Sequence, residues 1–308
     1  MTPCLLIAGP TAAGKTALSL AAAELLGGEI INADSMQVYD GLPLITAQPD
    51  AHERAQAPHH LFGTIDPAVR YSVGEWTRDV LALIGACRAR GRVPILVGGT
   101  GLYFNALVRG LAAVPEISDA TRKHVANMLD AAGLSGLRAE ALRLDPVAAR
   151  RVEAADRQRL MRIVEVAIET GRPLSAFQAD TVAPLVAGTW RGIVIEPDRE
   201  ALYARIDTRF DRMLDMGALD EVANFAARGL DPDLPACKAL GVPQLMAHLR
   251  GEMTFDEAVE LAKRDSRRYA KRQGTWFRNQ AASWDRITSL DPVTAREALA
   301  VMLEGEAT

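Results

Sequence analysis

A glycine-bearing loop near the start of the chain has the residue types and spacing of a phosphate-binding site. Residues 9–16 read GPTAAGKT, which fits G-x-x-x-x-G-K-[ST] between a strand and a helix. Such glycines let successive N–H groups point at an anion, and the next helix adds its positive end. The spacing predicts a diphosphate site, with a chance turn before a helix as the alternative. Lys15 would supply a positive charge to the outer phosphate, and Thr16 would hold Mg²⁺. The residues of the predicted site are Gly9, Pro10, Thr11, Ala12, Ala13, Gly14, Lys15 and Thr16.

The loop predicts diphosphate binding more directly than nucleotide hydrolysis. A nucleotide such as ATP would fit the same cradle, but an NTPase usually has an acidic residue at the end of another strand to help hold the metal. The apolar segment Pro94–Val97 is instead followed by Gly98-Gly99-Thr100-Gly101. The missing carboxylate argues against simple nucleotide hydrolysis.

A carboxylate and a hydroxyl follow two other predicted strands. Asp34 comes directly after Glu29–Ala33, and Thr100 lies in the glycine-rich turn after the third predicted strand. Ligands of open parallel sheets bind beyond the carboxyl ends of the strands, so Asp34 could take a proton from an amine or hydroxyl. Thr100 could approach the same centre from the other side, and Gln37 has atoms suited to a base edge. Capping roles for Asp34 and Thr100 are the alternatives, which the sequence leaves open.

Strand and helix patterns alternate along the chain, which predicts an α/β fold with a P-loop NTPase-like parallel sheet. Apolar runs predict strands at Leu5–Ala8, Glu29–Ala33, Pro94–Val97 and Trp190–Ile195. Helical patterns cover Ala17–Leu26 and Val80–Arg90 and resume near Leu102. We predict a helical insertion domain over residues 115–188 within a core formed by residues 1–114 and 189–308. The clearest helices of the C-terminal part are expected at Arg205–Arg228 and Phe255–Arg278.

Composition narrows the class of protein. The 308 residues exceed the length at which one hydrophobic core usually stops growing. Cys4, Cys87 and Cys237 are far apart and form no CxxC pair, which is typical of a reducing compartment without disulfides or structural zinc. No apolar run is long enough for a signal peptide or a membrane span. We therefore expect a cytoplasmic monomer that has no membrane partner.

Basic residues gather in two helical segments, although the net charge of −4 argues weakly against nucleic-acid binding. A solvated helix face explains either cluster alone, whereas the pair favours phosphate contact. The insertion carries Arg138, Arg143, Arg150, Arg151, Arg157, Arg159, Arg162 and Arg172. The late helix carries Lys263, Arg264, Arg267, Arg268, Lys271, Arg272 and Arg278, and among these Lys271 and Arg272 are assigned to RNA contact.

Several aromatic and histidine side chains have two readings. Tyr269, Trp276 and Phe277 interleave with the late basic cluster and could stack on bases, but helical spacing makes core packing at least as plausible for the last two. His59 and His60 are adjacent and lack a third ligand at a sensible spacing, which favours a structural role over a metal site.

Taken together, these motifs resemble the bacterial tRNA dimethylallyltransferases, also called tRNA isopentenyltransferases. The matching segments run in order across nearly the whole chain, and their combination is far more specific than any one of them. They are GPTAAGKT at 9–16, DSMQVY at 34–39, PHHL at 58–61, GGTGLY at 98–103, DRQRLMRIVE at 156–165 and YAKRQGTWFR at 269–278.

The resemblance implies a reaction and a set of roles. The family moves a dimethylallyl group from dimethylallyl diphosphate to N6 of the adenine 3′ to the anticodon, in tRNAs reading codons that begin with U, using Mg²⁺. By resemblance Asp34 would accept the N6 proton, Thr100 would orient the amine, and Arg122 would steady the departing diphosphate. The anticodon stem-loop would contact Asp34, Ser35, Met36, Gln37, Gln158, Arg159, Leu160, Met161, Arg162, Lys238 and Gly241, the last two within a 238–243 segment.

Three other functions share part of this pattern. A small-molecule P-loop kinase would bind ATP tightly without depending on RNA. An enzyme that prenylates free AMP would not need the long arginine-rich insertion. A non-catalytic RNA-binding module would not need the phosphate loop together with Asp34 and Thr100.

Overall fold

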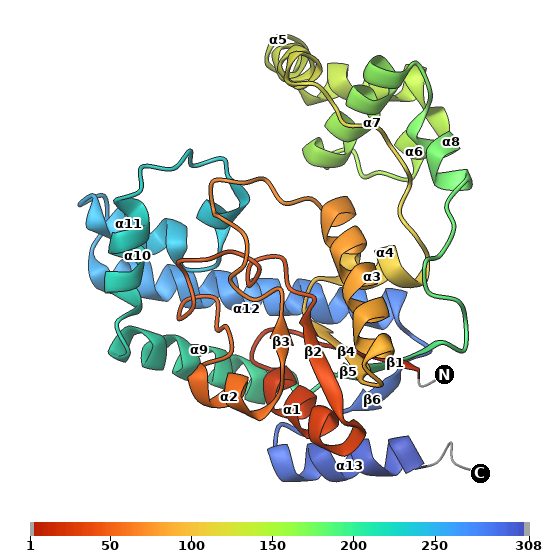
Figure 1. Ribbon diagram of the computed structural model, residues 1–308. Helices are drawn as coiled ribbons and strands as arrows, with labels where there is room; N and C mark the ends of the chain where they lie inside the picture. Colours follow the sequence, from red (N-terminus) through yellow and green to blue (C-terminus); the bar gives the residue numbers. More distant parts are fainter. Residues whose placement is uncertain (1–2, 305–308) are drawn as a thin grey trace. The chain divides into compact units, whose positions relative to one another are not determined.

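The computed structural model describes residues 3–304, which form an α/β fold around one parallel sheet (Figure 1). Within these residues the sheet has the strand order β3-β2-β4-β1-β5-β6, and every neighbouring pair is parallel. The strands are β1 (Cys4–Ala8), β2 (Gly28–Asn32), β3 (His59–His60), β4 (Val93–Gly98), β5 (Trp190–Ile195) and β6 (Asp285–Ile287). The predicted fold class is confirmed.

The central strands are apolar because helices cover both faces of the sheet. Side chains alternate between faces along a strand: Leu6 packs with Trp76 and Phe277 on one side, while Leu5 packs with Leu18 and Leu299 on the other. The first face is covered by α3 (Val73–Ala89), α4 (Gly101–Val108) and α12 (Phe255–Gln280). The second is covered by α1 (Lys15–Leu26), α9 (Arg199–Asp215) and α13 (Pro292–Glu304), with α13 against α1 (Figure 1).

The helical insertion is a compact unit of its own, from Arg109 to Pro184. Helices α5 (Asp119–Leu144) and α7 (Arg157–Thr170) pack together around Val125, Leu137 and Ile163. The predicted bounds of 115 and 188 lie a few residues further along the chain. The other helices of this unit are α6 (Pro146–Arg150) and α8 (Leu174–Ala179).

The C-terminal helices differ from the predicted pattern at one position. The helix predicted at Arg205–Arg228 is two helices, because α9 ends at Asp215 and α10 (Ala218–Ala226) follows. Gly217 between them has φ 97°, a left-handed conformation that ends one helix and caps the next. The remaining elements are α2 (Ala51–Gln56), the 3₁₀ turn Pro235–Lys238 and α11 (Val242–Leu249).

No helix within residues 3–304 has both the length and the apolar character needed to cross a membrane.

Candidate active site

The phosphate loop joins the end of β1 to the start of α1. Gly14 has φ 92° as the cap before Lys15, and a Cβ on Gly9 would lie 2.9 Å from the carbonyl oxygen of Ile195. Glycine is therefore required at position 14 for its left-handed backbone conformation and at position 9 for close packing. Nζ of Lys15 donates to the carbonyl oxygen of Pro10 at 2.7 Å, which holds the ammonium group over the loop.

One N–H of the loop does not serve the anion. The backbone N–H of Thr11 donates to Oε1 of Gln273 on α12 at 2.9 Å. This donor is occupied by a buried side chain that lies 262 residues further along the chain, so the remaining N–H groups of the loop are the ones left for an anion.

Asp34 lies at the carboxyl end of β2 and is held by its own turn. Asn32 is fully buried, and its Oδ1 accepts the N–H of Asp34 at 2.8 Å. Asp34 in turn accepts the N–H of Met36 on its Oδ1 at 3.0 Å. No hydrogen bond from the described residues reaches Oδ2 of Asp34. The capping interpretation is confirmed for Oδ1. The catalytic role of Asp34 is compatible with it and stays a prediction.

Thr100 approaches the Asp34 turn from β4, as the sequence predicted. Its N–H donates to the carbonyl oxygen of Ala33 at 3.2 Å, and its Oγ1 accepts the N–H of Ser35 at 2.9 Å. The two segments are so close that a Cβ on Gly98 would lie 2.0 Å from the carbonyl oxygen of Ala33. The glycine-rich turn is thus a packing requirement that brings the Thr100 hydroxyl beside residues 33–35.

Two cavities meet at Asp34. One, of about 320 Å³, is lined by the phosphate loop and by Gln37 and His59. The other, of about 300 Å³, is lined by Phe210, Tyr269 and other residues of α9 and α12. Both are lined by Thr11, Asp34, Thr46 and Arg209. This arrangement places a carboxylate and a guanidinium at the junction between an anion-binding cavity and a more apolar one; we call them the diphosphate cavity and the acceptor cavity.

Arg209 on α9 is a site residue that the sequence analysis did not find. Its guanidinium donates to Oγ1 of Thr11. Burial and, to a smaller extent, the neighbouring Arg205 lower the pKa of Arg209 to about 10, while Asp34 opposes the shift. Arg205 also lines the diphosphate cavity, and a spacing of four residues on a helix puts both on one face. That spacing was the available signal.

The loop lysine is also electrostatically perturbed. Burial lowers the pKa of Lys15 to about 8, Asp34 raises it and Arg209 lowers it. The diphosphate cavity is lined by three cations, Lys15, Arg205 and Arg209, and by two carboxylates, Asp34 and Glu53, so its lining carries excess positive charge. Such a cavity suits a multiply charged anion, whose own charge would restore full protonation of Lys15.

The predicted RNA-contacting residues fall into separate groups. Ser35, Met36, Lys238 and Arg272 line the acceptor cavity. Gly241 has φ 88°, and a Cβ there would lie 2.9 Å from the ring of Phe210, so its role is in the backbone.

Gln37 lines the diphosphate cavity, and its Nε2 donates to the carbonyl oxygens of Thr46 and Ala47, both at 2.8 Å. Its amide donor is therefore engaged with a loop, which corrects the assignment of that group to a base edge. Lys271, next to Arg272, lines a different pocket with Pro10, because adjacent residues on a helix face different ways.

Five of the predicted RNA-contacting residues lie on α7 in the insertion. Leu160 is fully buried in the core of that unit, so the assignment of this side chain to RNA contact is wrong; the apolar face of an amphipathic helix packs inward. Met161 packs partly against the same core, while Gln158 and Arg159 are exposed. Burial lowers the pKa of Arg162, Glu165 raises it and Arg122 lowers it further. The roles assigned to Arg122 and Arg162 remain predictions.

His60 belongs to a polar cluster around the buried carboxylate of Glu29, at the other end of β2. Its Nε2 lies 2.7 Å from Oε2 of Glu29, and the Arg90 guanidinium binds both oxygens of that carboxylate, at 2.6 and 3.0 Å. Glu29, His60 and Cys87 together have the donor set of a metal site. The Arg90 guanidinium already binds both oxygens of the Glu29 carboxylate, and its positive charge would repel a metal ion. The cluster therefore has a structural role.

Comparison with known proteins places this geometry in a family. The profile described as IPP transferase matches residues 37–280. The chain belongs to the IPP transferase family. A protein named tRNA dimethylallyltransferase from Maricaulis maris is 78% identical over 304 residues, which cover 99% of each chain. One of the same name from Caulobacter is 53% identical, with 94% of each chain covered.

Solved structures of the IPP transferase family share the fold. The full-length tRNA isopentenylpyrophosphate transferase from Bacillus halodurans is 34% identical, with a TM-score of 0.69, and the match covers 100% of this chain and 98% of that one. A eukaryotic dimethylallyltransferase described as acting on tRNA has a TM-score of 0.78 at 26% identity, over 90% of this chain and 70% of that one. The family profile starts at residue 37, after the phosphate loop and Asp34. The roles proposed for those residues therefore rest on the geometry of the cavities that they line.

Proposed function

We propose that this protein transfers the dimethylallyl group of dimethylallyl diphosphate to N6 of the adenine 3′-adjacent to the anticodon, in tRNAs reading codons that begin with U. The product would be N6-isopentenyladenosine. The observation that carries the proposal is the junction of the two cavities at Asp34 and Arg209. An allylic diphosphate bound on one side and an amine entering from the other would meet there. The names of the close relatives support the same reaction.

The diphosphate cavity suits the leaving group. An allylic carbon–oxygen bond ionises readily, so the cost lies largely in the negative charge that builds on the diphosphate. Fixed donors aimed at that charge lower the barrier. Lys15 and Arg209 both line this cavity, with the loop around them. Arg209 is therefore the guanidinium that we assign to the leaving group, while the part proposed for Arg122 awaits a test.

The donor set of the diphosphate cavity fits Mg²⁺. Thr16 lines this cavity, and no hydrogen bond within residues 3–304 occupies its hydroxyl. Mg²⁺ prefers oxygen ligands, keeps several waters and is bound through few protein groups plus phosphate oxygens. Thr16 would hold the ion together with the diphosphate, and the bound ion would supply charge neutralisation on the departing oxygens.

The acceptor cavity suits a base. Adenine N6 is a weak nucleophile because its lone pair is shared with the ring, so orientation and proton removal matter. Within residues 3–304 no hydrogen bond engages Oδ2 of Asp34, and that oxygen would accept the N6 proton. Ile45, Phe210 and Met213 give the cavity apolar walls, against which a base that has left its stack would pack and exclude water.

The mouth of the acceptor cavity suits an RNA backbone. Lys238 and Arg272 line both this cavity and an adjoining groove of about 340 Å³, which also contains Arg268. Phosphates flanking the flipped base would contact these cations, and the affinity would fall with salt. RNA contact by exposed residues of the insertion, such as Arg159, stays a separate prediction.

The direct test uses labelled dimethylallyl diphosphate and bulk tRNA. We expect label in the RNA, at the adenine next to the anticodon, only when Mg²⁺ is present. Label in free AMP but not in tRNA would instead support prenylation of a mononucleotide. Turnover of ATP without RNA, with no label transferred from the allylic diphosphate, would identify a kinase and overturn the proposal.

A further inference from the structure

A single buried amide joins the phosphate loop to the turn that carries Thr100. Gln273 on α12 is 5% exposed. Its Oε1 accepts the backbone N–H of Thr11 at 2.9 Å, and its Nε2 donates to the backbone carbonyl of Gly99 at 2.9 Å. Both bonds go to main-chain atoms, so the amide fixes the position of one loop relative to the other, whatever side chains they carry.

The packing around this amide leaves little freedom. A Cβ on Gly99 would lie 2.2 Å from Nε2 of Gln273, and a Cβ on Gly101 would lie 2.4 Å from the ring of Trp276. Two glycines therefore allow α12 to approach the turn closely. A close-packed contact of this kind transmits a displacement of the amide to the turn instead of absorbing it.

The same amide is connected to the Asp34 side through Tyr269. The Tyr269 ring lines the acceptor cavity with Asp34, and its hydroxyl is near enough to the Thr100 and Gln273 side chains for both to lower its pKa against the larger, opposite effect of burial. Thr100 in turn accepts the N–H of Ser35 at 2.9 Å. Through Gln273, the carbonyl of Gly99 and the adjacent Thr100, hydrogen bonds thus connect Thr11, at the leaving group, to Ser35, next to the proposed base.

We infer that Gln273 is a positioning residue that sets the separation between the bound diphosphate and the acceptor amine. This inference rests on the proposed function, because it concerns the alignment of those two substrates. The leaving oxygen is held by the loop that contains Thr11, and the amine is held between Asp34 and the Thr100 turn. Gln273 ties these two supports together, with Tyr269 as the second connection.

Misalignment has a chemical signature in this reaction. When the allylic carbon–oxygen bond breaks, the carbon is captured either by N6, with loss of its proton, or by water. Capture by water forms dimethylallyl alcohol and pyrophosphate, with the proton of the attacking water released. The diphosphate leaves in both cases, so the ratio of pyrophosphate released to label in tRNA reports how well the amine is aligned. A smaller folded fraction lowers both products equally and leaves that ratio unchanged.

The test measures this ratio in the full chain with Gln273→Met and Gln273→Glu. Methionine keeps the length and removes both hydrogen bonds, while glutamate keeps the acceptor for Thr11 and loses the donor to Gly99. Asn279→Leu, at an exposed amide on the same helix, is the matched control. Tyr269→Phe tests the second connection. Folding of each variant is followed by Tm, and the Kd for tRNA is measured at one salt concentration.

We expect wild type and Asn279→Leu to release one pyrophosphate for each group transferred. Gln273→Met should lower the kcat for transfer by roughly 100-fold, as for a small displacement of reacting groups, with the Kd for tRNA nearly unchanged. The ratio of pyrophosphate to transferred label should rise severalfold in both Gln273 variants and less in Tyr269→Phe. An unchanged ratio in both Gln273 variants overturns the inference while leaving the proposed function intact. Absence of transfer by the wild type overturns both.

Discussion

The N–H of Ser35 donates to Oγ1 of Thr100 at 2.9 Å, which joins the ends of β2 and β4 at the junction of the two cavities. Asp34 lies immediately before this contact. Its turn is therefore held from the side of the sheet by Asn32 and from the side of β4 by Thr100. A general base fixed in this way needs little rearrangement when the acceptor enters, which is the physical basis of preorganisation.

Replacing Asp34 with asparagine should slow transfer severely while sparing the fold. Asparagine keeps Oδ1 as the acceptor for the N–H of Met36 but cannot take the N6 proton. We expect kcat to fall by about 100-fold or more, with the Kd for tRNA within a few-fold of wild type. Asp40→Asn, at an exposed position on the same segment, is the control. Normal turnover by Asp34→Asn would exclude the general-base role.

Diphosphate binding should weaken as pH rises through the pKa of Lys15, which burial lowers to about 8. Only the protonated amine attracts the anion, so the affinity of the free protein should be highest below that pKa and fall above it. The measurement is the Kd of inorganic pyrophosphate between about pH 7 and 9.5. Lys15→Met should bind more weakly and lose this pH dependence; retention of the same dependence would assign it to another group.

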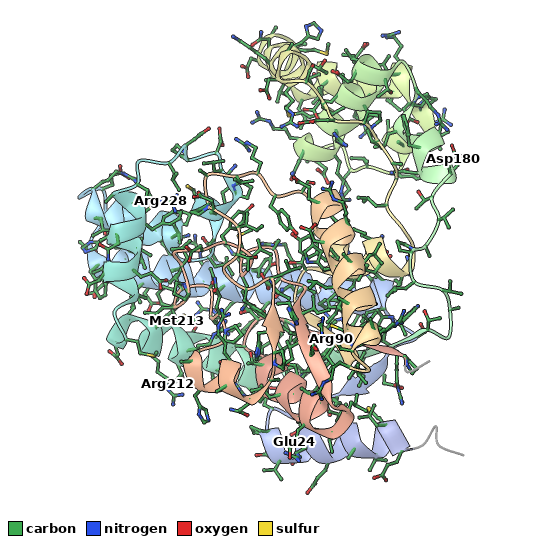
Figure 2. The ribbon with its side chains drawn as sticks, in the orientation of Figure 1. Glu24, Arg90, Asp180, Arg212, Met213 and Arg228 are labelled. Carbon is green, nitrogen blue, oxygen red and sulfur yellow. The ribbon has the colours of Figure 1, made fainter. Side chains whose placement is uncertain are left out.

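Arg209→Met should raise the barrier to departure of the diphosphate. The variant removes the guanidinium at Thr11 and leaves an apolar chain of similar length, so we expect kcat/KM for dimethylallyl diphosphate to fall by roughly 100-fold. The matched control is Arg212→Met, one turn further along α9, where the side chain is exposed (Figure 2). Equal activity of the two variants would remove Arg209 from the site.

The Glu29 cluster should contribute to stability against acid. Hydrogen bonds from Arg90 above all, and also from His60, lower the pKa of Glu29 to about 2 against the opposing effect of burial. A carboxyl whose folded pKa is depressed stabilises the protein above its unfolded pKa, and that stability is lost as pH falls from about 4.5 to about 2.

Glu29→Gln should therefore lower Tm by several degrees at pH 7 and flatten the dependence of Tm on pH in this acid range. Glu24→Gln is the control, since its pair with Arg296 at 2.8 Å is exposed (Figure 2), and exposed pairs contribute little. The measurement is thermal unfolding at several pH values, and equal Tm losses in the two variants would contradict the prediction.

The sequence predicted the framework of the site because the phosphate loop and the main strands depend on residues that are close together in the chain. A glycine-bearing loop between a strand and a helix can be recognised from its spacing alone. Because the strands are parallel, their carboxyl ends put Asp34 and Thr100 at the same edge of the sheet. The very short β3 and β6 carry little periodicity, and both were missed. Gly217 divided a helix that the pattern extended to Arg228, since a single glycine is a weak stop signal until its conformation is known.

The sequence alone determined the phosphate loop, the α/β fold and the position of Asp34 at a strand end. Only the tertiary structure decided which distant side chains complete the site. Thr11 meets Arg209 across 198 residues and Gln273 across 262 residues. Helical periodicity shows that α9 and α12 each have an apolar face that packs inward, but it does not specify which strand end that face contacts. That choice is made by packing of the whole core, because close-packed helices and sheet fit together in only one register.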